Sequence, residues 1–198
     1  MIIDPNKFDK RSNFDECLSE LNVYAQRIPI EMPRITVGSF REAYNTWSGR
    51  GMYFTNERRI NVDLKRCKTA TKTPGFAWSY TGYKADMTPA GVLAHEFGHH
   101  YDHVRSIVKK HRRTIGELHD AEGCVSSYCP NPSEWFAETF RLFFLNHDLL
   151  MRAKPRTFGF MRDELQLPSP RDEEWRDIMV NAHPRFITAC ERFIASSI

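Results

Sequence analysis

The pentapeptide His95-Glu96-Phe97-Gly98-His99 constrains this chain more than any other feature of its sequence. On an α-helix, its two histidines lie one turn apart on one face, with the carboxylate of Glu96 beside them. Two imidazoles so placed can hold a zinc ion, and the carboxylate can take a proton from an activated water. The motif therefore indicates a zinc-dependent hydrolase, if the segment is helical and a third ligand lies elsewhere.

The segment around the motif is expected to be a helix. Thr88 is a suitable N-cap and Pro89 suits the first helical position. Gly98 would let another backbone approach behind His99. A basic run at 109–113 falls near the expected end of this helix, where cations suit the macrodipole, so a solvated terminus explains it better than nucleic-acid binding. Apolar residues recur at helical spacing on the side away from the histidines: Leu93, Ala94, Phe97, Tyr101, Val104 and Val108.

Catalytic zinc sites offer three protein ligands and leave one position for water, so a third ligand is needed. His103 is separated from His95 by about 12 Å of helix rise, too far to share one ion. His111 would require the helix to end early and the chain to fold back, which the intervening sequence does not favour. Cys124 and Cys129 lack the close pairing of structural zinc sites, and we expect ordinary reduced cysteines there.

Glu134 is the favoured third ligand. The sequence at 131–134, Asn-Pro-Ser-Glu, has the order of an N-cap, a first-position proline and a carboxylate in the first turn. Residues 135–145 are apolar around most of the circumference, as in a buried helix. Glu134 and Glu138 share one face of that helix, and buried carboxylates are costly without cations or donors. Zinc for Glu134 and an imidazole N–H for Glu138 would satisfy both. The alternative is a terminal charge at Glu134 and a pair between Glu138 and Arg141.

Three segments together resemble one family of metallopeptidases. HEFGHH at 95–100, SSYCPNPSEWFAETFRLF at 126–143 and KPRTFGFM at 154–161 are similar to the catalytic domain of anthrax lethal factor and to the related Pro-Pro endopeptidases. The likeness covers residues 90–166, and the blocks occur in the family's order. It implies a zincin-like metallopeptidase of the gluzincin type, whose substrate is a protein or peptide.

Carried over residue by residue, the resemblance also implies the roles of the site residues. Glu96 would be the general base, Tyr128 would assist the oxyanion, and Glu138 would be the acid behind the ligands. One zinc ion would be the cofactor, with three ligands: His95, His99 and Glu134.

Two other classes of function stay open. A zinc-containing structural or host-interaction protein, such as a phage or virion component, would keep the metal without catalysis. A DNA-associated metalloprotease would carry HExxH with a later histidine, for which His111 is available. The net charge of only +3 gives no argument for nucleic acid as a partner.

The 198 residues are expected to form one α+β domain, with an N-terminal α/β lobe at about 1–87 and a helical lobe with the metal site at about 88–198. A small mixed or antiparallel sheet should lie beside the HExxH helix. Its strands are expected at 34–37 and, as a hairpin, at 52–55 and 59–64.

Other segments are predicted to supply scaffold or to border the site. The loop 66–86 carries Trp78, Tyr80 and Tyr83, which are candidates for contacting substrate. Aromatic side chains in such a loop can equally pin it to the body of the protein. Further helices are expected at 13–27, 39–47, 147–153, 156–166, 171–181 and 185–196.

The compartment is inferred from what the sequence lacks. The N-terminus has no basic segment followed by an apolar run, and no apolar stretch reaches the length of a membrane span. The five scattered cysteines are typical of a reducing compartment. We therefore expect a cytoplasmic protein, with a phage- or virus-encoded protein, or one delivered without a cleaved signal, as the alternatives.

Overall fold

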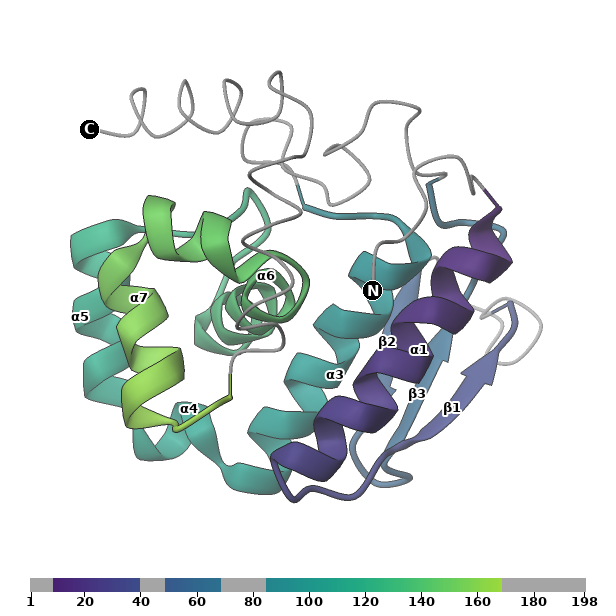
Figure 1. The fold of residues 1–198 in the computed structure, drawn as a ribbon, viewed down its shortest axis with the longest axis horizontal. Coiled ribbons are helices and arrows are strands. Elements are labelled where there is room, and N and C mark those ends of the chain that lie inside the picture. Colours follow the sequence, from purple (N-terminus) through teal and green to yellow (C-terminus); the bar gives the residue numbers. More distant parts are fainter. Residues whose placement is uncertain (1–8, 40–48, 69–84, 169–198) are drawn as a thin grey trace.

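The computed structural model describes residues 9–39, 49–68 and 85–168, and every structural statement below concerns these residues (Figure 1). Three predicted helices lie outside these residues, apart from residue 39 of the first: 39–47, 171–181 and 185–196. The candidate substrate contacts Trp78, Tyr80 and Tyr83 lie outside them as well.

The sheet is small and mixed. Its strands are β1 (Arg34–Val37), β2 (Gly51–Phe54) and β3 (Arg59–Val62), in the order β1-β3-β2. β1 runs parallel to β3, and β2 runs antiparallel to it. The central strand β3 is buried along its whole length. The predicted strand and hairpin are therefore confirmed.

Helix α1 (Lys10–Arg27) packs against the helix that carries the HExxH motif. Asp9 caps α1, because its side chain accepts a hydrogen bond from the backbone N–H of Ser12. The side-chain oxygen of Asn13 accepts from the N–H of Ala90 at 2.8 Å, which satisfies a donor in the first turn of the next long helix.

The HExxH motif lies on α3 (Pro89–Arg105), which begins as predicted. Thr88 is the N-cap, and its hydroxyl accepts from the N–H of Gly91 at 3.1 Å. All of the residues from Pro89 to Gly98 are buried. Leu93 and Phe97 belong to the central hydrophobic core.

The prediction that this helix continues through the basic run is wrong. Ser106 takes a left-handed conformation (φ 54°, ψ 43°) and ends α3, and the Asp102 carboxylate accepts the N–H of Val108 instead. Two further helices follow, α4 (Ile107–Lys110) and α5 (Arg112–Glu122). Val104, expected in the apolar stripe, is exposed.

Helix α6 (Pro132–Ala153) contains the residue predicted as the third ligand. It is kinked at Asn146 (φ −154°, ψ 66°), whose side chain accepts from the N–H of Leu149 and so caps the second segment. A short helix, α7 (Pro155–Gly159), and one turn of π-helix, η1 (Phe160–Glu164), complete the described chain.

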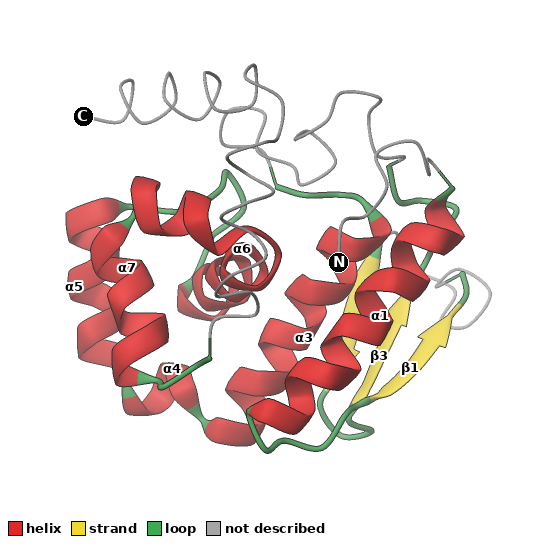
Figure 2. Ribbon diagram, in the orientation of Figure 1, coloured by secondary structure: helices red, strands yellow, loops and turns green. Residues whose placement is uncertain are grey.

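Helix α3 lies between the sheet and α6, and α5 and α7 lie beyond α6 (Figures 1 and 2). Gly98 permits the close contact between α3 and α6, as predicted. A Cβ at Gly98 would lie 2.9 Å from the Cα of Ala137. The close approach brings the first turn of α6 against the motif.

The arrangement confirms the coarse α+β class, with mostly helical structure beside a small sheet. Among the described helices, we find none that is both long enough and apolar enough to traverse a bilayer.

Candidate metal centre

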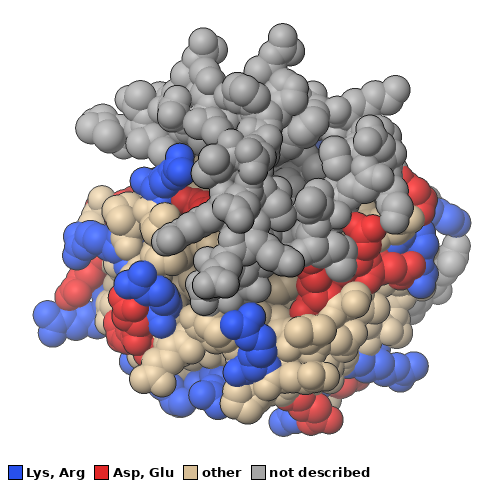
Figure 3. All heavy atoms as spheres, in the orientation of Figure 1, with Lys and Arg blue, Asp and Glu red and all other residues tan. Residues whose placement is uncertain are grey.

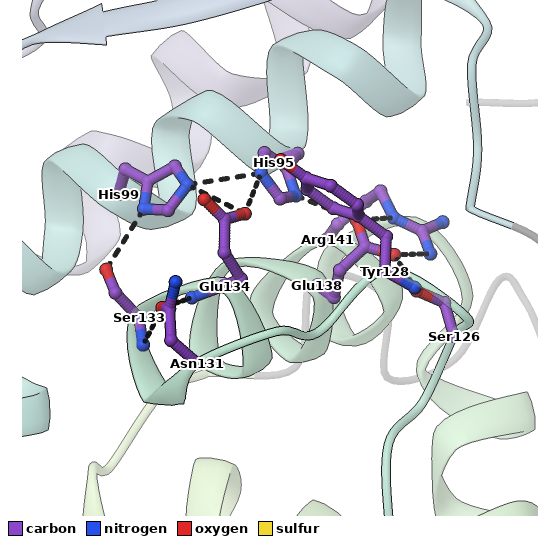
Figure 4. Close-up of polar contacts among 9 residues, drawn as sticks. All are labelled: His95, His99, Ser126, Tyr128, Asn131, Ser133, Glu134, Glu138 and Arg141. Carbon is purple, nitrogen blue, oxygen red and sulfur yellow. Dashed lines mark hydrogen bonds and ion pairs between the residues drawn. The ribbon is translucent and has the colours of Figure 1, made fainter.

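Three potential metal ligands converge from two helices (Figure 4). The Nε2 atoms of His95 and His99, both on α3, lie 3.1 Å apart. The Oε2 atom of Glu134, in the first turn of α6, lies 3.1 Å from the first and 3.4 Å from the second. The structure thus brings together the three side chains that the sequence suggested as ligands.

The spacing of these atoms fits a tetrahedral zinc ion. Zinc–nitrogen and zinc–oxygen bonds of about 2.0–2.1 Å place any two tetrahedral ligand atoms roughly 3.3–3.5 Å apart. Oε2 of Glu134 is also buried, and among the described residues no donor other than the two imidazole nitrogens approaches it. Such an atom needs a cation or a donor, so the observed triangle suits a metal ion.

A buried carboxylate orients His95. Nδ1 of His95 donates to Oε1 of Glu138 at 2.7 Å, which leaves Nε2 directed at the other two ligands. Glu138 is held in turn by Arg141, whose guanidinium donates to both carboxylate oxygens at 3.1 and 2.8 Å. The hydroxyl of Ser126 donates to Oε2 of the same carboxylate. The two partners that the sequence offered for Glu138, an imidazole and Arg141, therefore bind it together.

The other two ligands are positioned by the start of α6. Asn131 caps the helix, and its Oδ1 accepts from the N–H groups of Ser133 and Glu134, both at 3.0 Å. The hydroxyl of Ser133 lies 3.3 Å from Nδ1 of His99. Ser133 and Ser126 were not identified from the sequence, because nothing local marks a serine as the partner of a distant side chain.

The site requires positive charge. Burial lowers the pKa of His95, but hydrogen bonds with Glu134 and Glu138 outweigh burial and raise that pKa to about 10. Burial raises the pKa of Glu134, but hydrogen bonds from His95 and His99 outweigh it and lower the pKa to about 2. The carboxylates of Glu134 and Glu138 outnumber the one arginine beside them, so the imidazoles favour an added proton or a metal ion.

Glu96 lies on the side of α3 that faces the sheet edge. Its carboxylate accepts a hydrogen bond from the backbone N–H of Tyr53 in β2, and a Cβ on Gly51 would meet its Oε1 at 2.7 Å. Burial raises the pKa of the Glu96 carboxyl. A cavity of about 200 Å³ opens here, and His95, Glu96 and Tyr128 are among the residues that line it. The carboxylate can therefore reach a small molecule beside the ligands.

Tyr128 lies over the same cavity. Its ring centroid is 5.8 Å from that of His95, and the side chain is 48 % exposed (Figure 4). The N–H of Tyr128 donates to the hydroxyl of Ser126 at 3.2 Å, which ties its backbone to the group that holds Glu138. Burial and then the nearby carboxylates raise the pKa of the phenol, so it stays protonated and can donate at neutral pH.

The two histidines considered as alternative ligands contact other side chains. Nδ1 of His103 is hydrogen-bonded to the hydroxyl of Tyr53 at 2.8 Å. His111 lies beyond the break at Ser106, and its Nδ1 is 2.8 Å from Glu164. The chain does turn at Ser106, where no turn was predicted, but the turn does not bring His111 to the triad.

The expectation of two reduced cysteines at Cys124 and Cys129 is wrong for this structure, because their sulfur atoms form a disulfide. The two residues come together only through the turn that follows α5, and no local sequence pattern predicts their pairing.

Comparison with known proteins identifies no relative: no family model, no curated protein and no solved structure matches this chain.

Proposed function

We propose that this protein is a zinc-dependent metallopeptidase with a zincin-like arrangement of its site. One observation carries the proposal: the candidate ligand atoms of His95, His99 and Glu134 converge beside a cavity that Glu96 helps to line. The resemblance of its three motifs to lethal factor and the Pro-Pro endopeptidases supports the same assignment.

Zinc bound by the triad would act as a Lewis acid and lower the pKa of a coordinated water to about 7. Glu96, with its carboxylate at the cavity, takes a proton from the attacking water and delivers it to the leaving amine. The Tyr128 hydroxyl donates a hydrogen bond to the oxyanion that develops on the substrate carbonyl. Glu138 holds His95 in the tautomer that leaves Nε2 available.

A protein or peptide substrate suits the surroundings of the site. Gly51 of β2 lines the same cavity as Glu96, and β2 is an edge strand of the described sheet. An extended peptide can bind along such an edge through main-chain hydrogen bonds.

The test measures zinc content and cleavage of a peptide library by the purified chain. We expect one zinc ion at the triad and cleavage that disappears in Glu96→Gln, which serves as the blank because the variant keeps all three ligands. Glu134→Ala should lose this zinc. Unchanged turnover in Glu96→Gln, or unchanged zinc in Glu134→Ala, would contradict the proposal.

Two outcomes of the same measurements favour the other classes of function. Zinc binding without cleavage of any peptide favours a structural or host-interaction protein. Cleavage that requires DNA favours a DNA-associated protease. On the face seen in Figure 3, basic and acidic side chains are interspersed over the described residues, which gives the second alternative no support there.

A further inference from the structure

A second cluster of metal-binding side chains lies at the end of α5. Nε2 of His119 and the sulfur atoms of Cys124 and Cys129 lie within 4.8 Å of one another. None of the three contributes to the proposed peptidase centre. The set has two soft sulfur donors and one imidazole, which is a donor set that zinc prefers.

The local sequence explains why these residues meet. His119 lies in the last turn of α5, and the N–H of Gly123 donates to its carbonyl at 2.8 Å. Gly123 has φ 68° and ψ −163°, a conformation that is essentially restricted to glycine. The chain therefore reverses there and brings the sulfur of Cys124 to 3.5 Å from Nε2 of His119.

The distances agree with tetrahedral coordination. Zinc–sulfur bonds of about 2.3 Å and zinc–nitrogen bonds of about 2.0 Å imply nitrogen-to-sulfur separations of roughly 3.5 Å. The observed separation of His119 Nε2 from Cys124 Sγ is 3.5 Å. Two thiolates on one zinc lie roughly 3.8 Å apart. Cysteines whose Cα atoms are 6.2 Å apart, as Cys124 and Cys129 are, reach that separation by rotation about χ1.

The surroundings also suit a cation. Nδ1 of His119 lies 3.8 Å from the carboxylate of Asp120, which is beyond hydrogen-bond distance but puts a negative charge beside the imidazole. The cluster also lies at the C-terminal end of α5, where the helix dipole favours positive charge.

The end of α5 is anchored on two sides. The carboxylate of Glu122 accepts from the N–H groups of Arg156 and Thr157, both at 2.9 Å. Nε1 of Trp135 donates to the carbonyl of Gly123 at 3.3 Å. The framework that holds His119 and Cys124 therefore does not depend on the bond between the two sulfurs.

We propose that the reduced protein binds a second zinc ion through His119, Cys124 and Cys129, with water in the fourth position, and that the disulfide replaces this ion on oxidation. The oxidant is a small disulfide such as oxidised glutathione. One thiolate attacks it and releases one glutathione thiolate. The second cysteine sulfur then attacks the mixed disulfide and releases the other. Two electrons pass from the cysteines to glutathione, and Zn²⁺ leaves because a disulfide offers it no thiolate.

The experiment compares the zinc content of the full chain, measured by elemental analysis, in a thiol reductant and after oxidised glutathione. We expect about two zinc ions per reduced chain and about one per oxidised chain. The double variant Cys124→Ser, Cys129→Ser should hold about one in both conditions, and Cys67→Ser, which changes a buried cysteine elsewhere, should match the wild type. Equal zinc in the reduced wild type and the double serine variant would overturn the proposal.

A spectroscopic measurement keeps the test independent of folding in the variants and of peptidase activity. Cobalt replaces zinc, and thiolate ligands give it a sulfur-to-cobalt charge-transfer band. The proposal requires that band in the reduced wild type and in Glu134→Ala, which disables only the first site. It requires loss of the band when oxidised glutathione is added. Absence of the band from the reduced wild type would overturn the proposal while leaving the peptidase assignment intact.

Discussion

Glu138 accepts a hydrogen bond from Nδ1 of His95 at 2.7 Å while both of its oxygens bind the buried Arg141. The carboxylate therefore has two tasks. It fixes the imidazole whose other nitrogen belongs to the proposed metal triad, and it neutralises a guanidinium that is completely buried. A change at Glu138 should affect both metal affinity and stability, and the two effects can be separated.

We expect Glu138→Gln to lower zinc affinity by about 10- to 100-fold, because the neutral amide orients and polarises His95 less well. The free energy of unfolding of the metal-free protein should fall by about 3–5 kcal/mol, because Arg141 stays buried without a counter-charge. Zinc titration against a competing chelator and urea unfolding measure the two effects.

The double variant Glu138→Gln, Arg141→Met serves as the control. It removes the buried cation, so it should recover part of the lost stability while zinc affinity stays low. Zinc affinity that returns together with stability would mean that Glu138 acts only through folding.

Tyr128→Phe should keep zinc and stability but slow peptide hydrolysis. The hydroxyl is the only group removed, and loss of one donor to an oxyanion typically lowers kcat by about 10²- to 10³-fold. The side chain is half exposed, so the free energy of unfolding should change little. Steady-state kinetics with a cleaved peptide measures the effect. A kcat equal to that of the wild type would exclude the phenol from the chemistry.

The elements predicted best were those with strong local signals. Thr88 and Pro89 marked the start of α3, and Asn131 and Pro132 marked the start of α6. Hydrophobic periodicity then predicted one apolar face for the first of these helices and burial around most of the circumference for the second. Because both starts were placed correctly, the face shared by Glu134 and Glu138 was also correct.

The features that were missed depend either on local turns with weak sequence signals or on contacts between segments distant in sequence. Helix α3 ends at Ser106 although no glycine or proline lies there. The Asp102 carboxylate accepts a hydrogen bond from the N–H of Val108, which stabilises the turn. Ser126 and Ser133 take their roles only once the loop before α6 packs on α3. The bond between Cys124 and Cys129 likewise follows from the turn at Gly123.

Gly98→Ala should destabilise the protein, although alanine is the better helix former. The new methyl group would lie 2.9 Å from the Cα of Ala137, and backbone atoms there cannot move aside without separating α3 from α6. We expect a loss of about 1–3 kcal/mol in the free energy of unfolding, measured with urea.

Gly116→Ala is the matched control for that change. Gly116 also lies inside a helix, α5, but a Cβ there meets nothing within 4 Å among the described residues. This variant should be more stable by up to about 1 kcal/mol, from helix propensity alone. If the free energy of unfolding changed in the same direction in both variants, the close approach of α6 would not explain why glycine occupies position 98.

Cys67 provides a prediction about pH. Burial raises the pKa of its thiol from 9.0 to about 12. Only the thiolate reacts with iodoacetamide, so in the folded protein the labelling rate should keep rising about tenfold per pH unit beyond pH 9. At pH 8, the three-unit shift makes the thiolate about 1,000-fold rarer than in an ordinary cysteine. Mass spectrometry of labelled peptides, with the urea-unfolded chain as the reference, measures the difference. A folded-state rate that levels off near pH 9 would show that this thiol is hydrated, and a slow rate in urea would point to the local sequence instead of burial.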